Sequence, residues 1–188
     1  MPNPYTQRIF GCYEEDSADE RNLYMDLRRA LRKTPNTQCQ FFLNYRITDF
    51  GVDSQYFYVQ DYQKEYLQFV MNRCNLPKQD ASFLLSLING ASTRANTLRV
   101  DAVKMKNGKL VMAIELNRAS HYDFDAHETI EDYREFAKSQ FNDMVKEIEM
   151  RKICEFYVAN MDWVENHGPS NEKSMELVRV LHDFTHDL

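Results

Sequence analysis

Hydrophobic positions repeat at helical spacing in some stretches of the chain and form short apolar runs in others. Helical spacing over 53–74, over 78–89 and from about 126 to 151 predicts three helices. Two more helices are predicted, one from about 17 to 33 behind a capping box at Ser17–Glu20, the other from Ser170 onward. Apolar runs rich in aromatic and branched residues at 39–47 and 153–159 predict strands.

The clearest local signal is a hairpin over residues 98–117, with its turn at Asn107-Gly108. The predicted order is helix, strand, two helices, two strands, helix, strand, helix. This order indicates an α/β or α+β fold with a small mixed sheet of about four strands flanked by helices. The length of 188 residues suits a single domain, residues 1–188.

Two registers of this hairpin are open. A two-residue loop at Asn107-Gly108 places Asp101 opposite Ile114 and points Asp101 and Glu115 to opposite faces. A three-residue loop with a bulge places Asp101 opposite Ala113 and points both carboxylates the same way. The second register is favoured because it separates the carboxylates from an aliphatic face made of Leu98, Val100, Ala102, Leu110, Met112, Ile114 and Leu116.

Composition adds that the chain should fold, with 43% hydrophobic and 13% aromatic residues. No apolar stretch has the length of a membrane span or of a signal peptide. The four cysteines are scattered without a CxxC pair. We therefore expect a soluble, intracellular protein with reduced thiols and no membrane partner.

Charge is distributed unevenly around a net value of −6. Residues 94–118 hold only two acids, Asp101 and Glu115, whereas residues 119–188 hold 16 acidic and 7 basic side chains. A basic stretch around two carboxylates is typical of a phosphate-handling site, although lysines that merely solvate an exposed hairpin give the same pattern. The candidate nucleic-acid-binding residues are Arg94, Arg99, Lys104, Lys106, Lys109 and Arg118.

The hairpin resembles the PD-(D/E)xK nuclease superfamily. The resemblance rests on Val100-Asp101-Ala102-Val103, on the turn 106–109 and on the run 110–117, which contains Glu115 and Asn117. A predicted long helix and another strand follow, as in the core of that family. The resemblance implies a nuclease-like fold and a divalent ion, Mg²⁺ or Mn²⁺, at the hairpin.

Carried over residue by residue, the resemblance makes Asp101 and Glu115 metal ligands and Glu20 an upstream acid. Asn117 stands where the family has the lysine that orients and deprotonates the attacking water, and Val100 stands where it has proline. An amide can hydrogen-bond water but cannot exchange a proton as an amine does. With Asp101, Glu115 and Asn117 as the candidate catalytic residues, we expect slow hydrolysis or binding alone.

Histidines and acids alternate just after the hairpin, at His121, Asp123, Asp125 and His127. On an extended segment these side chains would share one side, forming a separate metal site or adding His121 to the hairpin ligands. Alternatively, residues 125–128 are a capping box that starts the long helix. His182 and His186 are expected to be a solvated pair.

Aromatic side chains at Tyr56, Phe57, Tyr58, Tyr62, Tyr66 and Phe69 could be helix core, a partner groove or a surface that stacks on bases. Motifs of nucleotide kinases, dinucleotide enzymes, serine hydrolases and zincins are absent from the sequence. We expect a metal-dependent, nuclease-like domain that acts on or binds nucleic acid. The alternative is a non-enzymatic protein–protein interaction factor with an acidic surface, and the small size would suit a viral or mobile-element origin.

Overall fold

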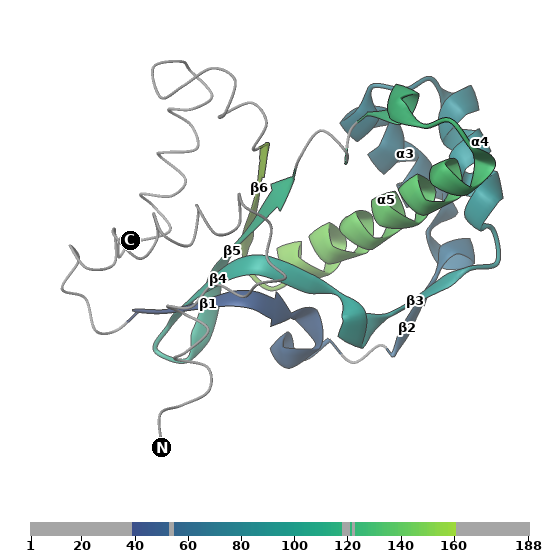
Figure 1. Cartoon of the computed structure of the whole chain (residues 1–188). Coiled ribbons are helices and arrows are strands. Elements are labelled where there is room, and N and C mark those ends of the chain that lie inside the picture. Colours follow the sequence, from purple (N-terminus) through teal and green to yellow (C-terminus); the bar gives the residue numbers. More distant parts are fainter. Residues whose placement is uncertain (1–38, 53–54, 118–120, 122, 161–188) are drawn as a thin grey trace, which may run out of the picture. The chain divides into compact units, whose positions relative to one another are not determined.

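The computed structural model describes residues 39–52, 55–117, 121 and 123–160 (Figure 1). The chain divides into two compact units, the first with residues 1–45, 100–117 and 153–188, the second with residues 46–99 and 118–152. The helices predicted at 17–33 and from Ser170 lie outside the described residues, and the single domain stays a prediction. Within the described ranges, no helix combines the length and the apolar character needed to cross a membrane.

The first unit contains a four-stranded mixed sheet. Its strands are β1 (Cys39–Arg46), β4 (Arg99–Lys106), β5 (Lys109–Asn117) and β6 (Glu155–Asn160), in the order β1-β4-β5-β6. Strand β5 runs antiparallel to β4 and parallel to β6. The predictions of a mixed fold and of a four-stranded sheet are confirmed, with β1 and β6 within two residues of their predicted starts.

The central pair of this sheet is buried on both faces. Ala102 and Ile114 are cross-strand partners on one face, Val103 and Ala113 are partners on the other, and all four side chains are fully buried. Small and branched apolar residues fit such a two-sided environment. Asp101, Lys104 and Glu115 lie in this part of the two strands and are buried as well, so the groups that face them determine their role.

The second unit is mostly helical (Figure 1). Helices α3 (Gln63–Cys74), α4 (Lys78–Ile88) and α5 (Ile130–Arg151) pack against one another around buried Tyr66, Leu84 and Phe141. A two-stranded antiparallel sheet joins β2 (Tyr56–Tyr58) to β3 (Ser92–Arg94). Short 3-10 helices connect these elements: η1 (Ile47–Phe50), η2 (Val59–Tyr62), η3 (Ala95–Thr97) and η5 (Phe124–Ala126).

The helix predicted over 53–74 is wrong before Gln63, because Tyr56–Tyr58 is a strand and α3 begins only at Gln63. Phe57 points inward while its two tyrosine neighbours are exposed, and this alternation is the strand period. Helix α4 is confirmed between Pro77 and Gly90, whose left-handed φ of 84° suits a residue without Cβ.

Helix α5 ends at Arg151 as predicted, but the capping box predicted at 125–128 is wrong. Thr129 is the N-cap: its hydroxyl accepts from the Asp132 N–H at 3.1 Å, and the Asp132 carboxylate accepts from the Thr129 N–H at 3.3 Å. Asp123 instead caps η5 by accepting from the Asp125 N–H at 3.2 Å. The reciprocal bonds at Thr129 satisfy two backbone donors, which residues 125–128 do not.

Candidate functional site

The hairpin turn contains two residues with positive φ, Asn107 at 50° and Gly108 at 76°. Positive φ at both central positions is the signature of a two-residue type I′ turn. Further along the strands, Lys104 pairs with Met112 and Met105 pairs with Leu110, so Val111 is an extra residue on β5. Such an extra residue is a β-bulge, and it shifts the pairing of all residues beyond it.

Neither predicted register is therefore correct. The two-residue loop is present, but the bulge at Val111 shifts the register of the strands by one residue. Asp101 and Glu115 therefore lie on the same face of the sheet, as expected for the three-residue loop. Ala102 pairs with Ile114, and continuing this register by one residue places Asp101 directly across from Glu115. The prediction that Asp101 lies opposite Ala113 is wrong because Ala113 pairs with Val103.

Asp101 and Glu115 thus share one face of the sheet, and each is more than nine-tenths buried, with 8% and 7% of its surface exposed. Side chains directly opposite on antiparallel strands have Cβ atoms about 5 Å apart. Two carboxylates this close repel each other when both are ionised, so such pairs share a proton or hold a cation. The arrangement suits a divalent ion with oxygen ligands.

The two carboxylates do not by themselves complete a metal centre. No group of three or more histidine, cysteine or acidic side chains suited to an ion is present among the described residues. Glu20 and Arg118 lie outside the described residues, and Asn117 ends β5 with its side chain outside the described part of the chain. Water can supply the remaining positions around Mg²⁺, which keeps several waters in most protein sites.

The basic residues of the hairpin are spread over several environments. Lys104 is 2% exposed and lies on the face of Ala102, opposite the face of Asp101. Lys106 and Lys109 are partners across the turn, with Lys109 exposed and Lys106 half-buried, as is Arg99. Arg94 is exposed on β3 in the second unit. Lys109 and Arg94 are accessible to a phosphate, whereas Lys104 is buried away from such contacts.

The alternating residues after the hairpin do not form a four-ligand row. His121 Nδ1 lies 2.8 Å from Asp143 Oδ2, and Asp123 caps η5. The His127 ring packs against the rings of Tyr133 and Phe136, with centroids 5.4 and 4.6 Å apart. Residues 124–126 thus form a 3-10 turn, and His121, Asp123 and His127 contact different groups instead of sharing one side of an extended strand.

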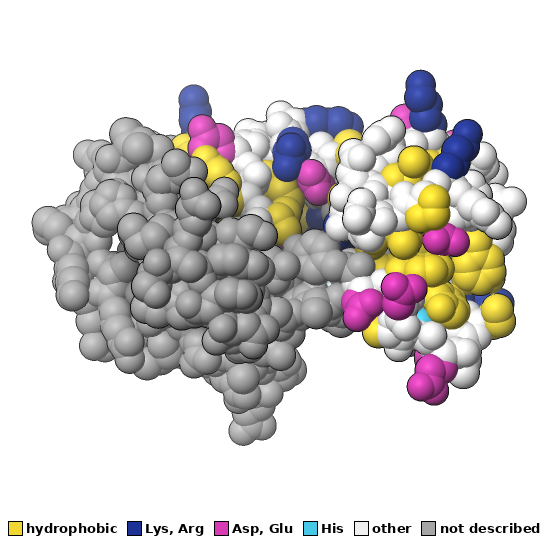
Figure 2. All heavy atoms as spheres, turned by 90° about the horizontal axis from the view of Figure 1, so that it is seen from above, with side chains coloured by type: hydrophobic (Ala, Val, Ile, Leu, Met, Phe, Trp, Pro, Cys, Tyr) yellow, Lys and Arg dark blue, Asp and Glu magenta, His cyan; other side chains and the backbone are white. Residues whose placement is uncertain are grey.

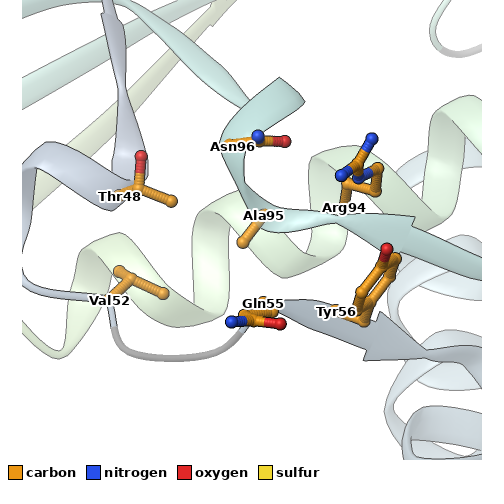
Figure 3. A pocket seen from close by; sticks show the side chains of 7 residues that line it. All are labelled: Thr48, Val52, Gln55, Tyr56, Arg94, Ala95 and Asn96. Atoms are coloured by element: carbon orange, nitrogen blue, oxygen red, sulfur yellow. The ribbon is translucent and has the colours of Figure 1, made fainter.

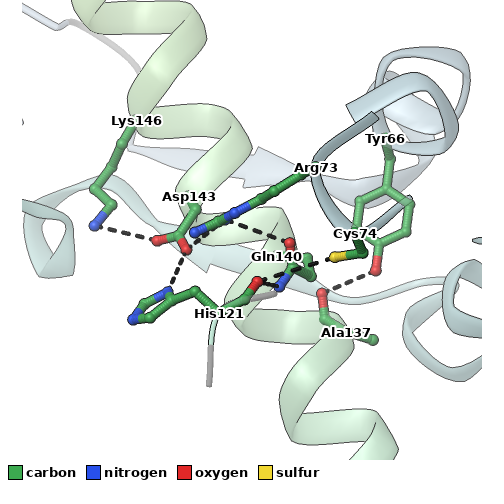
Figure 4. A network of polar contacts seen from close by, with 8 residues as sticks. All are labelled: Tyr66, Arg73, Cys74, His121, Ala137, Gln140, Asp143 and Lys146. Carbon is green, nitrogen blue, oxygen red and sulfur yellow. Dashed lines mark hydrogen bonds and ion pairs between the residues drawn. The ribbon is translucent and has the colours of Figure 1, made fainter. Parts of the chain in front are cut away.

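Asp143 on α5 is the centre of a polar network that the sequence analysis missed (Figure 4). Its Oδ2 accepts from Arg73 Nη1 at 2.7 Å, and Lys146 Nζ lies 3.3 Å from its Oδ1. Burial opposes ionisation, but the hydrogen bond from His121 and the charges of Lys146 and Arg73 outweigh it and hold the pKa of Asp143 well below its usual range.

The same network connects His121 to α3 and α5. The His121 carbonyl accepts from Gln140 Nε2 at 2.6 Å, and the Cys74 thiol lies 3.9 Å from that oxygen. Burial raises the pKa of Cys74 to about 11, so this thiol is protonated at neutral pH and unsuited to nucleophilic catalysis. Arg73 and Asp143 are 70 residues apart, so local sequence patterns could not predict their contact.

The Cys154 thiol is similarly inert, because burial and then the charge of Glu155 raise its pKa to about 11.

Comparisons of the chain with models of protein families, with curated proteins and with solved structures gave no match. The resemblance of the hairpin to the PD-(D/E)xK superfamily stays a prediction. Function is therefore inferred from the residues and their geometry.

Proposed function

We propose that the chain is a nuclease-like domain that binds a divalent ion, Mg²⁺ or Mn²⁺, at Asp101 and Glu115 and acts on or binds nucleic acid. The observation that supports this most is the placement of two buried carboxylates on one face of neighbouring strands. A divalent ion would bind both carboxylates at once and offset the repulsion between them in this buried position.

The order of elements around the hairpin supports the same proposal. Helix α5 and strand β6 follow the hairpin, and β6 joins β5 in parallel. A long helix and a further strand are what the family resemblance implies after the two carboxylate-bearing strands. The observed order of elements is therefore compatible with the resemblance, which supports the proposal.

When bound, such an ion lowers the pKa of a coordinated water and offsets the negative charge of a phosphodiester. Asp101 and Glu115 would hold it from two adjacent strands, and the buried sheet keeps both side chains in place. The Asn117 amide would hydrogen-bond to a water molecule without removing a proton from that water. Hydrolysis by this domain is therefore proposed to be slow compared with that of a domain with lysine at this position.

The test is a calorimetric titration of Mn²⁺ into the full chain and two variants, Asp101→Asn and Glu115→Gln. We expect one site in the wild type and an affinity at least about tenfold lower in each variant, since loss of even an outer-shell group costs 10- to 100-fold. The matched control is Glu155→Gln, which removes an exposed carboxylate from β6 on the opposite face of the same sheet. This control should bind like the wild type.

Equal Mn²⁺ binding by the wild type and both hairpin variants would refute the proposal. So would the absence of binding in a wild-type sample that melts cooperatively. A melting scan with Mn²⁺ serves as a folding check, because an ion that binds only the folded state raises its stability.

A second candidate, a protein-interaction factor, is favoured by one surface feature of the second unit. Ile130 and Phe83 are exposed although large and apolar, and Phe83 contacts Tyr133 with ring centroids 5.7 Å apart. Exposed acids follow Ile130 directly in α5, at Glu131 and Asp132. Figure 2 shows a gathering of hydrophobic side chains flanked by acidic ones on the described surface. Apolar patches of this kind mark contact sites for partner proteins.

A further inference from the structure

The two-stranded sheet of the second unit has one exposed face. Tyr56 pairs with Arg94 and Tyr58 pairs with Ser92, so these four side chains project to the same side. Tyr56 and Tyr58 are 40% and 46% exposed, and their ring centroids are 6.2 Å apart at an angle of 31°. We call Tyr56, Tyr58, Ser92 and Arg94 the tyrosine face.

The opposite side of this small sheet is firmly anchored. Phe57 is buried, with its ring centroid 6.3 Å from that of Tyr62, which in turn lies 6.0 Å from Phe141 on α5. The Thr93 hydroxyl donates to Asn142 Oδ1 at 2.6 Å. The tyrosines are therefore exposed on a fixed support, which lowers the entropy lost when a ligand binds.

A hollow of about 360 Å³ adjoins the tyrosine face (Figure 3). Tyr56 and Arg94 belong to both, and the guanidinium carbon of Arg94 lies 5.7 Å from the centroid of the Tyr56 ring. The remaining lining combines apolar surface with a hydroxyl and two amides, from Thr48, Val52, Gln55, Ala95 and Asn96. Ala95 is buried, and its N–H donates to the Gln55 carbonyl at 2.9 Å, which joins the two sides of the hollow.

We propose that the tyrosine face and this hollow bind single-stranded nucleic acid. Tyrosines at alternate positions of a strand present successive flat surfaces on which unpaired bases stack. Arg94 supplies a charge and paired donors for a phosphate, while the amides of Gln55 and Asn96 can hydrogen-bond to the edges of a base. This inference rests on the proposed function, whose substrate class it names.

Charge supports nucleic acid over a basic or neutral partner. Among the residues that the structure describes there, the tyrosine face and the lining of the hollow include one cation, Arg94, and no acidic side chain, although the whole chain carries a net charge of −6. An acidic patch would repel phosphates, whose contacts with cations carry much of the affinity in such complexes. Bases within a duplex are already stacked and paired, so the tyrosines favour an unpaired strand.

The test measures fluorescence anisotropy of a labelled single strand of about 12 nucleotides, a length that covers a typical site. The full chain is used in EDTA, so the result does not depend on the proposed metal site. We expect the single strand to bind more tightly than a duplex of the same sequence. Tyr56→Ala and Tyr58→Ala should each weaken binding about fivefold or more, whereas Tyr56→Phe, which keeps the ring, should bind like the wild type.

Arg94→Gln should reduce the dependence of log affinity on log salt concentration by about 0.7, the value for one phosphate contact with a single strand. Lys78→Gln, which removes an exposed cation from α4, is the matched control and should leave the slope unchanged. Unchanged melting temperatures establish that the variants are folded.

Failure of the wild type to bind, equal affinity for the duplex, or full affinity in the folded tyrosine variants would each overturn the proposal. Because divalent ions are absent from this experiment, a negative result here leaves the Mn²⁺ titration at Asp101 and Glu115 to be judged separately. A negative titration with positive strand binding would in turn refute only the metal site.

Discussion

Asp143 is held ionised inside the second unit by Arg73, Lys146 and His121. Its folded pKa lies below the unfolded value of about 3.9, so its ionic contacts stabilise the fold above that pH. The contribution is lost as the pH falls through the folded pKa. Arg73, itself 9% exposed, would become a buried cation without its carboxylate partner if Asp143 were neutralised.

Asp143→Asn is therefore expected to lower the free energy of unfolding at pH 7 by about 3 kcal/mol or more, the usual cost of breaking a buried ion pair. The difference from the wild type should shrink below about pH 4, because Asp143 then takes up a proton in the unfolded wild type before it does so in the folded state, which lowers wild-type stability. Urea unfolding at several pH values measures both effects. An exposed control, Asp125→Asn, should leave stability unchanged, and a pH-independent difference for Asp143→Asn would contradict the account.

At the residue scale, the sequence identified the two carboxylates, the basic stretch and the aromatic run. It could not identify the partner of Arg73, which lies in another helix. The charge of Lys104 alone predicts a contact with nucleic acid, whereas the three-dimensional structure places this side chain on a buried face. Residue type predicts what a side chain can do, whereas burial and neighbours determine what it does.

Among the elements, the hairpin determines whether Asp101 and Glu115 meet. The extra residue Val111 offsets the two-residue turn, and without such an offset the carboxylates would point to opposite faces. The alternation of polar and apolar residues beyond the bulge made the shared face predictable. Nothing in the sequence near Val111 identified the bulge, since Val-Met-Ala-Ile continues the strand pattern without a glycine.

Gly108 provides a prediction at this scale. A Cβ at this position would meet no atom within 4 Å, so replacing Gly108 with alanine adds only the backbone strain of positive φ, about 1 kcal/mol. We expect Gly108→Ala to lower stability by that amount in urea unfolding without changing Mn²⁺ affinity. Asn107→Gly, which permits the same turn, is the control. Loss of metal binding by folded Gly108→Ala would show that the site depends on the turn itself.

Helix and strand identities were mostly predictable where the pattern is long, as in α4 and α5. The error at Tyr56–Tyr58 arose because three residues are too few to separate strand alternation from the start of a helix. Pairing with β3 determines that Tyr56–Tyr58 forms a strand, and β3 is more than 30 residues away in sequence. The start of α5 was predicted too early because the sequence at Asp125–Glu128 also resembles a capping box, whereas the reciprocal bonds form between Thr129 and Asp132.

On the scale of the whole molecule, the two proposed properties belong to different units. The carboxylate pair lies in the unit that holds the four-stranded sheet, and the tyrosine face lies in the helical unit. Each can therefore be tested independently, by metal in one case and by oligonucleotide in EDTA in the other. The four-stranded sheet and three of the helices were predictable from the sequence, whereas the two-stranded sheet and its exposed face are visible only in the structure.

The most direct test of the metal site uses the unaltered protein. Mn²⁺ is added stepwise to isotope-labelled wild type, and the broadening of backbone amide signals by the paramagnetic ion is followed by NMR. With the ion at Asp101 and Glu115, we expect signals from Val100–Ala102 and Ile114–Glu115 to broaden first, while those of the Asn107-Gly108 turn persist. Broadening that begins instead at the acidic surface of α5, around Glu147 and Glu149, would contradict it.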